Sequence, residues 1–363
     1  MKKIIYLFFL FICSGNAQGQ GQNDFFIDGR MHYGFVIAHR PKVGHLVTGH
    51  TRGVQLNIGK QTGKVIKEQD WHNIYNYPQT GITLLYLDFA NPEHLGYAFG
   101  ALAFADLPLI RNKNFSLSLN IASGIGYLTK KYETETNHKN TVTGSNLNGA
   151  VQIFFQTSYR LSQSTDFRMA LGLTHFSNGS YTTPNLGINN ASLSSGIIFY
   201  FDTSRSVAKK KVMPSPDKKI SYELIAAGSP KEIYPPHGQK YAAWTLSAEA
   251  VKPFTHKYHL GIGIDFLYDL SINARLSHDS IIDNVVSNRI RSGIFLSNEF
   301  IFSNLTVLLQ MGTYLYYPFK DDGSVYHRIG FRYLLSKHMF VNLTLRTHYA
   351  RADNNEFGLG YKF

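Results

Sequence analysis

A histidine and a serine stand two positions apart in the segment FRMALGLTHFS at residues 167–177. Successive side chains of a β-strand alternate between its two faces, so an extended chain here places His175 and Ser177 on one side with Leu171 and Leu173. The Cα atoms of residues i and i+2 lie roughly 6–7 Å apart, a distance that an imidazole and a hydroxyl can bridge. A serine that attacks an ester needs a general base within hydrogen-bond reach. The pattern therefore predicts ester hydrolysis by Ser177, activated by His175, on an apolar face.

The residues after the serine are of types that expose backbone N–H groups. Asn178, Gly179 and Ser180 turn the chain, and both Asn and Gly tolerate left-handed backbone conformations. Such N–H groups could stabilise the oxyanion that forms during acyl transfer. Extending the alternation of the next segment, ASLSSGIIFYF, backwards places Asn189 on the side of His175. There its amide could accept the imidazole proton and fix the tautomer.

A non-catalytic explanation of the His175–Ser177 spacing remains open. A His-x-Ser spacing can arise by chance in a chain with 15 histidines, and the pair could be interfacial polar residues at a strand end.

A second segment, VNLTLRTHYA at 341–350, resembles residues 167–177 but has Ala350 in place of the serine. One extra residue puts His348 on the side of Asn342 and Arg346. If the segments derive from a duplication, the second site is inactive, and coincidental similarity is the other explanation.

The N-terminus predicts a secretory signal peptide over residues 1–17. Lys2 and Lys3 precede the apolar run IIYLFFLFIC, and small residues lead to Ala17. A run of this length is too short to cross about 30 Å of hydrocarbon as a helix. The only cysteine, Cys13, lies inside the segment, so we expect neither disulfides nor thiolate chemistry in the mature chain.

Composition and the C-terminus together predict a transmembrane antiparallel β-barrel of the bacterial outer membrane. Aromatic residues make up 14% of the chain and charged residues only 17%, and no later apolar run is long enough for a membrane helix. The last segment, FGLGYKF, alternates apolar residues with others and ends on Phe363. It resembles the terminal strand by which outer-membrane proteins are recognised for assembly. A soluble β-sandwich, which shows similar alternation, is the alternative.

Period-two segments recur in two sets on either side of a basic, Pro-containing connection at residues 203–218. Together the two sets could form one barrel of about 12–16 strands. Because eight strands are enough to close a small barrel, the alternative is an eight-stranded barrel with a second β-unit. The expected strands lie near 31–38, 52–59, 80–88, 96–105, 115–126, 148–160, 167–177, 191–202, 219–228, 241–251, 258–270, 287–302, 304–315, 325–334, 339–349 and 355–363.

The net charge of +12 does not indicate a nucleic-acid partner. Basic residues are scattered through apparent loops, without a basic helical stripe or a nucleic-acid motif. Two explanations account for the positive charge equally well: basic loops beside an anionic lipid surface, and ordinary solvated loop charges. His39, His45 and His50 lack a regular metal-ligand spacing and are interpreted as solvated loop histidines, so no metal site is predicted.

The stretch LGLTHFSNGSYTTPNLGIN resembles the lipid A 3-O-deacylase (PagL) family, also called acyloxyacyl hydrolases. The resemblance covers residues 28–202 and leaves 203–363 outside it. It implies an eight-stranded outer-membrane barrel whose His-x-Ser-Asn motif faces lipid. The P-N-x-G-I spacing after the motif also matches, beginning at Pro184. Residues 219–363 are then expected to supply additional strands that complete the barrel.

The resemblance also implies a role for each site residue. Ser177 would be the nucleophile and His175 the base, while Asn178 and Ser180 would donate backbone N–H groups to the oxyanion. Ser180 stands where the family usually has glycine. Asn189 stands where its best-known members have the glutamate that orients the histidine. An amide can hold an imidazole, but it stabilises imidazolium less than a carboxylate does.

The sequence thus predicts an outer-membrane serine esterase that removes an ester-linked acyl chain from lipid A of lipopolysaccharide in the outer leaflet. No metal or redox cofactor is expected, and the oligomeric state stays open. Two other functions remain as alternatives. One is a non-catalytic porin with a widened lumen. The other is a structural barrel descended from the deacylase, in which the replacement of glutamate by Asn189 indicates that the activity has been lost.

Overall fold

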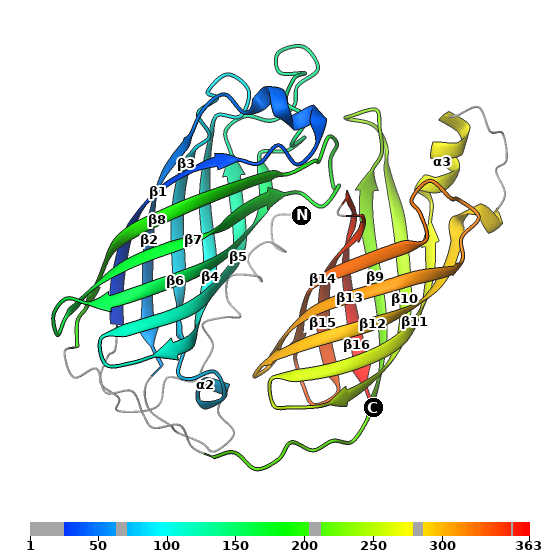
Figure 1. Ribbon diagram of the computed structural model, residues 1–363. Coiled ribbons are helices and arrows are strands. Elements are labelled where there is room, and N and C mark those ends of the chain that lie inside the picture. The colour runs from blue at the N-terminus through cyan, green and yellow to red at the C-terminus, as the bar shows by residue number, and fades with distance from the viewer. Residues whose placement is uncertain (1–24, 63–70, 203–211, 279–285, 350) are drawn as a thin grey trace.

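The fold is all-β, with sixteen strands in the described residues that form two closed antiparallel barrels side by side (Figure 1). It was obtained as a computed structural model, which describes residues 25–62, 71–202, 212–278, 286–349 and 351–363. The predicted signal peptide at 1–17 lies outside the described residues.

The first barrel consists of eight strands that pair in sequence order and close through β1 and β8. The closing register runs from Phe26 opposite Tyr200 to Val36 opposite Asn190. The strands are β1 (Phe25–Val36), β2 (Thr51–Gln61), β3 (Gln79–Asp88), β4 (Tyr97–Arg111), β5 (Phe115–Leu128), β6 (Leu147–Arg160), β7 (Thr165–Ser177) and β8 (Ile188–Tyr200).

The second barrel repeats this topology and closes through β16 and β9, from Phe357 opposite Gly228 to Lys362 opposite Glu223. Its strands are β9 (Ser221–Glu232), β10 (Lys240–Pro253), β11 (Tyr258–Asp269), β12 (Ile290–Phe302), β13 (Leu305–Tyr316), β14 (Val325–Leu334), β15 (Met339–His348) and β16 (Arg351–Lys362). Short helical segments lie in the connections of both barrels: η1 (Pro41–Leu46), α2 (Trp71–Ile74), α3 (Ser271–His278) and η2 (Val286–Arg289).

The two barrels decide between the two predicted architectures. A single barrel of about 12–16 strands is not what forms, because β8 pairs back with β1 instead of continuing to β9. The alternative, an eight-stranded barrel with a second β-unit, is confirmed. Residues 219–363 close a barrel of their own rather than completing the first. Each expected strand overlaps one observed strand, and the largest differences are that β1 begins at Phe25 rather than near residue 31 and that β4 ends at Arg111 rather than near residue 105.

Both barrels carry apolar side chains outside and polar ones inside. In β1, Met31 is 72% exposed, whereas Asp28 and Arg30 point inward and are buried. In the second barrel Ile262 and Ile264 are both 60% exposed on β11. Large exposed apolar side chains around buried charges suit a lipid environment, since water would favour the reverse. Among the helices of the described residues, none is both long and apolar enough to cross a membrane.

Polar and charged side chains project into both lumens, as expected for barrels of eight strands. In the first barrel, Asp28 accepts hydrogen bonds from Arg30 and from Arg168, the latter at 3.0 Å. In the second, Arg328 bonds Asp265 and Glu356, both at 2.7 Å. These buried charges are therefore paired with one another inside each barrel.

Most of the long connections lie at one end of each barrel, which we call the upper end (Figure 1). Among those at the upper end are residues 37–50, 129–146 and 178–187. The opposite, lower end has tight turns such as 112–114 and 303–304, together with one long connection, 62–78, between β2 and β3. Since β7 runs toward the upper end, His175 and Ser177 lie beside the long connections.

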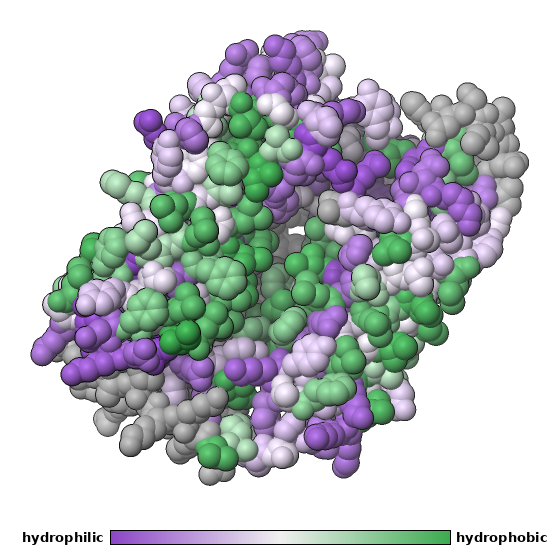
Figure 2. Space-filling view, viewed as in Figure 1, coloured by the Kyte–Doolittle hydropathy of each residue, from purple (hydrophilic) through white to green (hydrophobic). Residues whose placement is uncertain are grey.

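The barrels contact each other at both ends. At the lower end the ring of Tyr75 stacks on Phe302, with the ring centroids 4.4 Å apart. At the upper end, residues 178–183 of the first barrel bond to β9 and β16 of the second. Between these contacts the surface is hollowed and hydrophobic residues line much of the recess (Figure 2). The apolar outer walls therefore face one another across a gap, below a polar bridge.

Candidate active site

The structure places His175 and Ser177 on the outer face of the first barrel, at the upper end of β7. Burial alternates along the strand, with Thr174 and Phe176 fully buried inside and their neighbours partly exposed outside. Phe176 packs into the apolar cluster inside the first barrel. That inward anchor fixes the parity of the strand, so the imidazole and the hydroxyl both project outward.

His175 is held by Asn189, as the alternation of the two strands predicted. The residues are direct partners across β7 and β8, and the His175 Nδ1–H donates to Asn189 Oδ1 at 2.6 Å. An amide oxygen only accepts, so the proton of the neutral imidazole lies on Nδ1 and Nε2 carries the lone pair. Within the described part of the chain, His175 Nε2 has no hydrogen-bond partner. The ring is therefore in the tautomer that a general base needs.

His39, which was predicted from the sequence to be a solvated loop histidine, also takes part in this arrangement through a hydrogen bond with Asn189. The Asn189 Nδ2 group donates to His39 Nδ1 at 3.1 Å, and His39 Nε2 donates to the Leu186 carbonyl at 3.0 Å. With its amide nitrogen turned toward His39, Asn189 must present its oxygen to His175. The other two loop histidines serve elsewhere: His45 bonds the Lys139 carbonyl and His50 stacks on Tyr33.

Ser177 is held by Asn185, to which the sequence analysis gave no role. Its Oγ donates to Asn185 Oδ1 at 3.2 Å and accepts from Asn185 Nδ2 at 3.0 Å. No hydrogen bond joins Ser177 to His175 among the described residues, and catalytic hydrogen bonds are often loose before substrate binds. The available signal for Asn185 was its place in the P-N-x-G-I spacing that follows the motif.

Gly187 leaves room for the histidine. It has φ +76°, and a Cβ there would lie 2.8 Å from His175 Cε1 and 3.5 Å from Nε2. Any side chain would therefore push against the edge of the ring that carries the free nitrogen. The glycine is required both by its backbone conformation and by this close approach.

The backbone N–H groups of the turn after the serine, where Asn178 and Ser180 were the predicted donors, differ in their bonding. Asn178 N–H donates to Asn185 Oδ1 at 3.1 Å, so it is occupied. Gly179 N–H donates to Ser177 Oγ at 3.2 Å. Ser180 N–H has no acceptor within the described residues. Both Gly179 and Ser180 are left-handed, with φ +63° and +64°.

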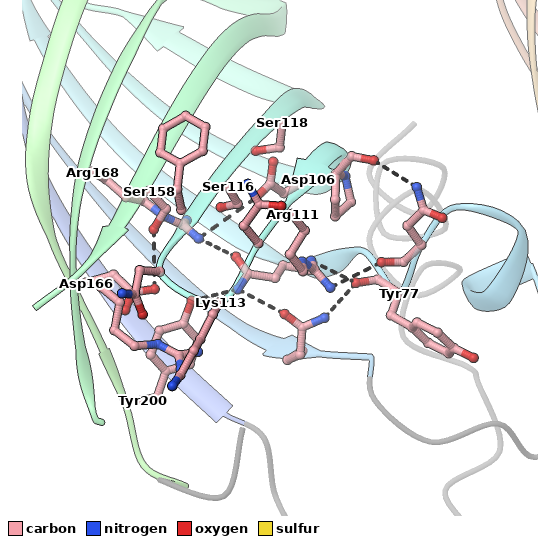
Figure 3. Close-up of a pocket in the computed structure, with 18 of the residues that line it drawn as sticks. Tyr77, Asp106, Arg111, Lys113, Ser116, Ser118, Ser158, Asp166, Arg168 and Tyr200 are labelled. Atoms are coloured by element: carbon pink, nitrogen blue, oxygen red, sulfur yellow. Dashed lines mark hydrogen bonds and ion pairs between the residues drawn. The ribbon is translucent and has the colours of Figure 1, made fainter. Parts of the chain in front are cut away.

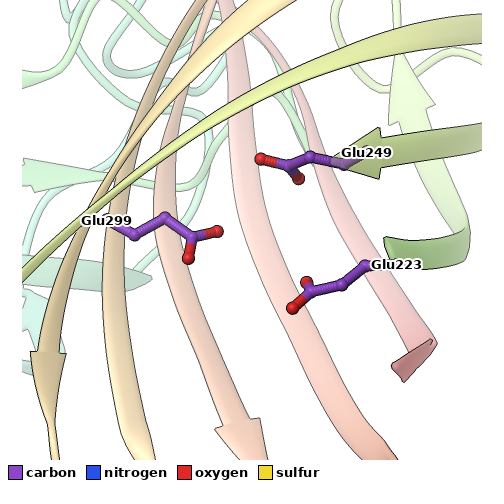
Figure 4. A group of neighbouring side chains, drawn as sticks. All are labelled: Glu223, Glu249 and Glu299. Atoms are coloured by element: carbon purple, nitrogen blue, oxygen red, sulfur yellow. The ribbon is translucent and has the colours of Figure 1, made fainter. Parts of the chain in front are cut away.

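Three buried glutamates in the second lumen, Glu223, Glu249 and Glu299, lie close enough to suggest a metal site (Figure 4). The guanidinium of Arg332 lies among these three carboxylates. Its Nη1 lies 3.1 Å from Glu223 and 2.7 Å from Glu299, and its Nη2 lies 2.8 Å from Glu249. A guanidinium that contacts all three carboxylates occupies the position of a cation, so the cluster is explained as part of the buried ion-pair network.

A cavity of about 610 Å³ opens at the lower end of the first lumen (Figure 3). Asp106, Arg111 and Arg168 are among the residues around it. The cavity lies in the lumen, at the end of the barrel opposite Ser177. The cavity is therefore separate from the outward-facing site.

Comparison with known protein families follows the division into two barrels. The family model described as Lipid A 3-O-deacylase (PagL) matches residues 60–197, and that described as Acyloxyacyl hydrolase, C-terminal domain, matches residues 220–363. The two matches cover most of the chain. The chain belongs to the PagL family. The second match corrects the expectation that residues 203–363 lie outside the resemblance, because most of that region is this family's C-terminal domain.

No curated protein matches the chain. Among solved structures, OccAB4 of Acinetobacter baumannii has 10% identity and a TM-score of 0.26, with 96% of this chain and 99% of that one covered. The NanC porin has 4% identity and a TM-score of 0.17, with 92% and 98% covered. A Rhodopseudomonas blastica porin mutant has 11% identity and a TM-score of 0.18, with 94% and 100% covered. Scores this low carry no argument, and the architecture rests on the strand pairing itself.

Proposed function

We propose that this PagL-family protein is a serine esterase that removes an ester-linked acyl chain from lipid A of lipopolysaccharide. The observation that carries the proposal is the His175–Asn189 pair beside Ser177 on an apolar outer wall. A base in the correct tautomer next to a hydroxyl has an evident use there only if the ester lies outside the barrel, in lipid. Lipid A carries its ester groups near the membrane surface, where the acyl chains meet the sugar, and Ser177 lies at the upper end of its strand.

The reaction uses Ser177 as nucleophile and His175 as general base. When the ester binds, the Ser177 hydroxyl leaves Asn185 and turns to His175 Nε2, which takes its proton as Oγ attacks the carbonyl carbon. The oxyanion accepts hydrogen bonds from the Ser180 N–H and from the Gly179 N–H, which the moving hydroxyl releases. His175 then protonates the departing sugar oxygen. Water, deprotonated by His175, hydrolyses the acyl-enzyme and releases a fatty acid.

Asn189 and His39 position the base. The amide holds the Nδ1 proton of His175, and His39 keeps that amide from turning over. This pair takes the place of the glutamate of the best-known members. A neutral amide stabilises the imidazolium less than a carboxylate, so its contribution lies mainly in orientation and tautomer. Asn178 contributes through its turn, because its N–H is bound to Asn185 in the resting site.

We propose the outer leaflet of the outer membrane as the location. Membrane barrels have short periplasmic turns and longer extracellular loops, which puts the upper end and Ser177 toward the cell surface. Exposed basic residues in the upper connections, including Arg40, Lys42 and Lys130, suit contact with anionic lipid headgroups. No cofactor enters the proposed steps.

The porin alternative predicts ion flow through a lumen. The buried pairs of Arg168 and Arg328 lie across the two interiors, with a cavity of about 610 Å³ at the lower end of the first lumen and one of about 10 Å³ in the second. We therefore expect planar bilayers containing the folded protein to show no steady conductance. A stable open channel would favour the porin alternative.

The test of the proposal is deacylation of native lipopolysaccharide by refolded protein, with lipid A analysed by mass spectrometry. Wild type should remove one acyl mass and Ser177→Ala should remove none. Ser195→Ala is the matched control, since Ser195 is also exposed on the outer face but lies opposite Met169. Full activity in folded Ser177→Ala would overturn the assignment, and folded wild type without activity would favour the structural-barrel alternative.

A further inference from the structure

The turn that follows Ser177 is bound by the second barrel. We call residues 178–183 the motif loop. Contacts from β9, β16 and Lys240 reach its backbone at several points, across a large separation in sequence. The second barrel therefore touches the site directly, on the side where the oxyanion donors lie.

Ser180 makes two of these contacts while in a left-handed conformation. Its hydroxyl donates to the Ala352 carbonyl at 2.8 Å, and its own carbonyl accepts from the Glu232 backbone N–H at 3.1 Å. A φ of +64° is uncommon for a residue other than glycine. These two bonds hold Ser180 in that conformation. They also give a reason for serine where the family usually has glycine, because glycine has no side chain that could donate to the Ala352 carbonyl.

Asn355 fixes the two residues that precede Ser180. Its Nδ2 donates to the Asn178 carbonyl at 2.9 Å. Its side chain also lies against Gly179, where an added Cβ would come within 2.2 Å of the Asn355 amide atoms. Gly179 is therefore confined between the first barrel and an amide from the second.

Glu232 holds the far end of the motif loop. Its Oε1 accepts from the Thr183 N–H at 3.1 Å and from the Thr183 hydroxyl at 3.0 Å. Lys240 pairs with Glu232 Oε2 at 3.3 Å, donates to the Tyr181 carbonyl and lies 3.9 Å from the centroid of the Tyr181 ring. Both ends of the motif loop are thus fastened to the second barrel, the first end by β16 and the far end by β9 and β10.

We infer that the second barrel is a positioning element for catalysis. It holds the motif loop so that the Gly179 and Ser180 N–H groups meet the oxyanion, with Asn355 and Glu232 as its positioning residues. Contacts from the second barrel go to carbonyls, to hydroxyls and to the Thr183 N–H. They leave the Ser180 N–H without an acceptor in the described part of the chain. The inference rests on the proposed esterase activity and explains why a first barrel that already carries the motif is joined to a second.

The experiment compares kcat and KM for full-length wild type, Asn355→Asp and Phe302→Ala with lipopolysaccharide as substrate. Asn355→Asp keeps the side-chain volume and removes the donor to the Asn178 carbonyl. Phe302→Ala removes a barrel–barrel contact at the lower end, far from the motif loop. Migration of unboiled samples on a gel establishes that each variant is folded.

We expect Asn355→Asp to lower kcat on the order of tenfold or more with KM within about twofold, since misplaced donors weaken the transition state. Phe302→Ala should leave both parameters near wild type. If folded Asn355→Asp keeps full kcat, or if Phe302→Ala lowers kcat equally, the positioning inference is overturned although the esterase stands. If folded wild type has no activity, the proposed function itself fails.

Should Asn355→Asp fail to fold, Ser180→Ala supplies the same test, because it removes only the hydroxyl that bonds the Ala352 carbonyl. We again expect a fall in kcat, of several-fold, with KM little changed. Unchanged kcat in this variant would count against the inference.

Discussion

In the first barrel His175 lies on the outer face of β7, whereas in the second His348 lies on the inner face of β15. Both histidines follow similar alternating segments near the upper end of their barrels. His348 is buried and its Nε2 is joined to the Tyr314 hydroxyl at 2.8 Å. His175 instead holds a free Nε2 beside a serine. A shift of one position along a strand decides whether a polar side chain joins the lumen network or faces lipid.

The barrels also differ in where their charges act. In the second, Arg328, Arg332 and Arg346 each bond carboxylates in the lumen, so its polar residues mainly hold the barrel together. Where it contacts the first barrel, it contributes Asn355 and Glu232 to the loop beside Ser177. In the proposed reaction one barrel thus carries the nucleophile and the base, and the other holds the loop beside them.

The largest expected effect separates the two histidines. His175→Ala should lower kcat/KM for deacylation by about a thousandfold or more, because the serine loses its base. His348→Ala should leave kcat/KM within about threefold, since that ring only bonds within the lumen. Steady-state assays on folded protein measure both. Equal losses in the two variants would remove the functional distinction between the barrels.

A second comparison concerns stability. Arg328→Ala leaves Asp265 and Glu356 buried without their shared cation and should destabilise the protein by about 3–5 kcal/mol. Arg168→Ala in the first lumen should cost less, about 1–3 kcal/mol, because Arg30 still pairs with Asp28. Urea unfolding in lipid vesicles compares the two variants. A larger loss from Arg168→Ala would show that the first lumen depends more on its ion pairs.

The next effect tests the amide beside the base. Asn189→Ala should lower kcat on the order of a hundredfold, because His175 loses the acceptor that fixes its tautomer. Asn189→Asp should match or exceed wild type, since a carboxylate holds the same proton and also stabilises imidazolium. Single-turnover rates report this step. Wild-type rates in Asn189→Ala would show that the amide does not orient the base.

The smallest effect belongs to His39, which acts through Asn189. His39→Ala should lower kcat by about three- to tenfold, because the amide then turns over part of the time. In Asn189→Asp, whose two oxygens are equivalent, removal of His39 should have no further effect. His45→Ala is the control from the same loop. A full additional loss from His39→Ala in the aspartate background would mean that His39 does not act through residue 189.

The strands could be predicted from the sequence because alternation is local. Every expected segment overlaps a strand, and the sides of His175, Ser177 and Asn189 follow from the same parity. Closure could not be predicted in this way. Whether β8 pairs with β1 or continues to β9 depends on hydrogen bonds between distant strands. The alternating patterns of β1 and β9 both suit pairing with β8.

The missed parts of the site come from the same limitation. His39 lies 150 residues before the amide that it bonds, and Asn355 lies 177 residues after the carbonyl that it bonds. Neither belongs to an alternating pattern that includes the motif. Asn185 is near in sequence, but its role depends on the fold of an irregular loop. Only the three-dimensional structure brings these side chains to Ser177.

The most direct measurement of the central claim is covalent labelling of the folded protein with a fluorophosphonate, which reacts with activated serines. Peptide mass spectrometry should find the label on Ser177 in wild type. In His175→Ala the label should be almost absent, while His348→Ala should label at the wild-type rate. An unlabelled Ser177 in folded wild type, or equal labelling in His175→Ala, would contradict an activated serine on the outer face of the first barrel.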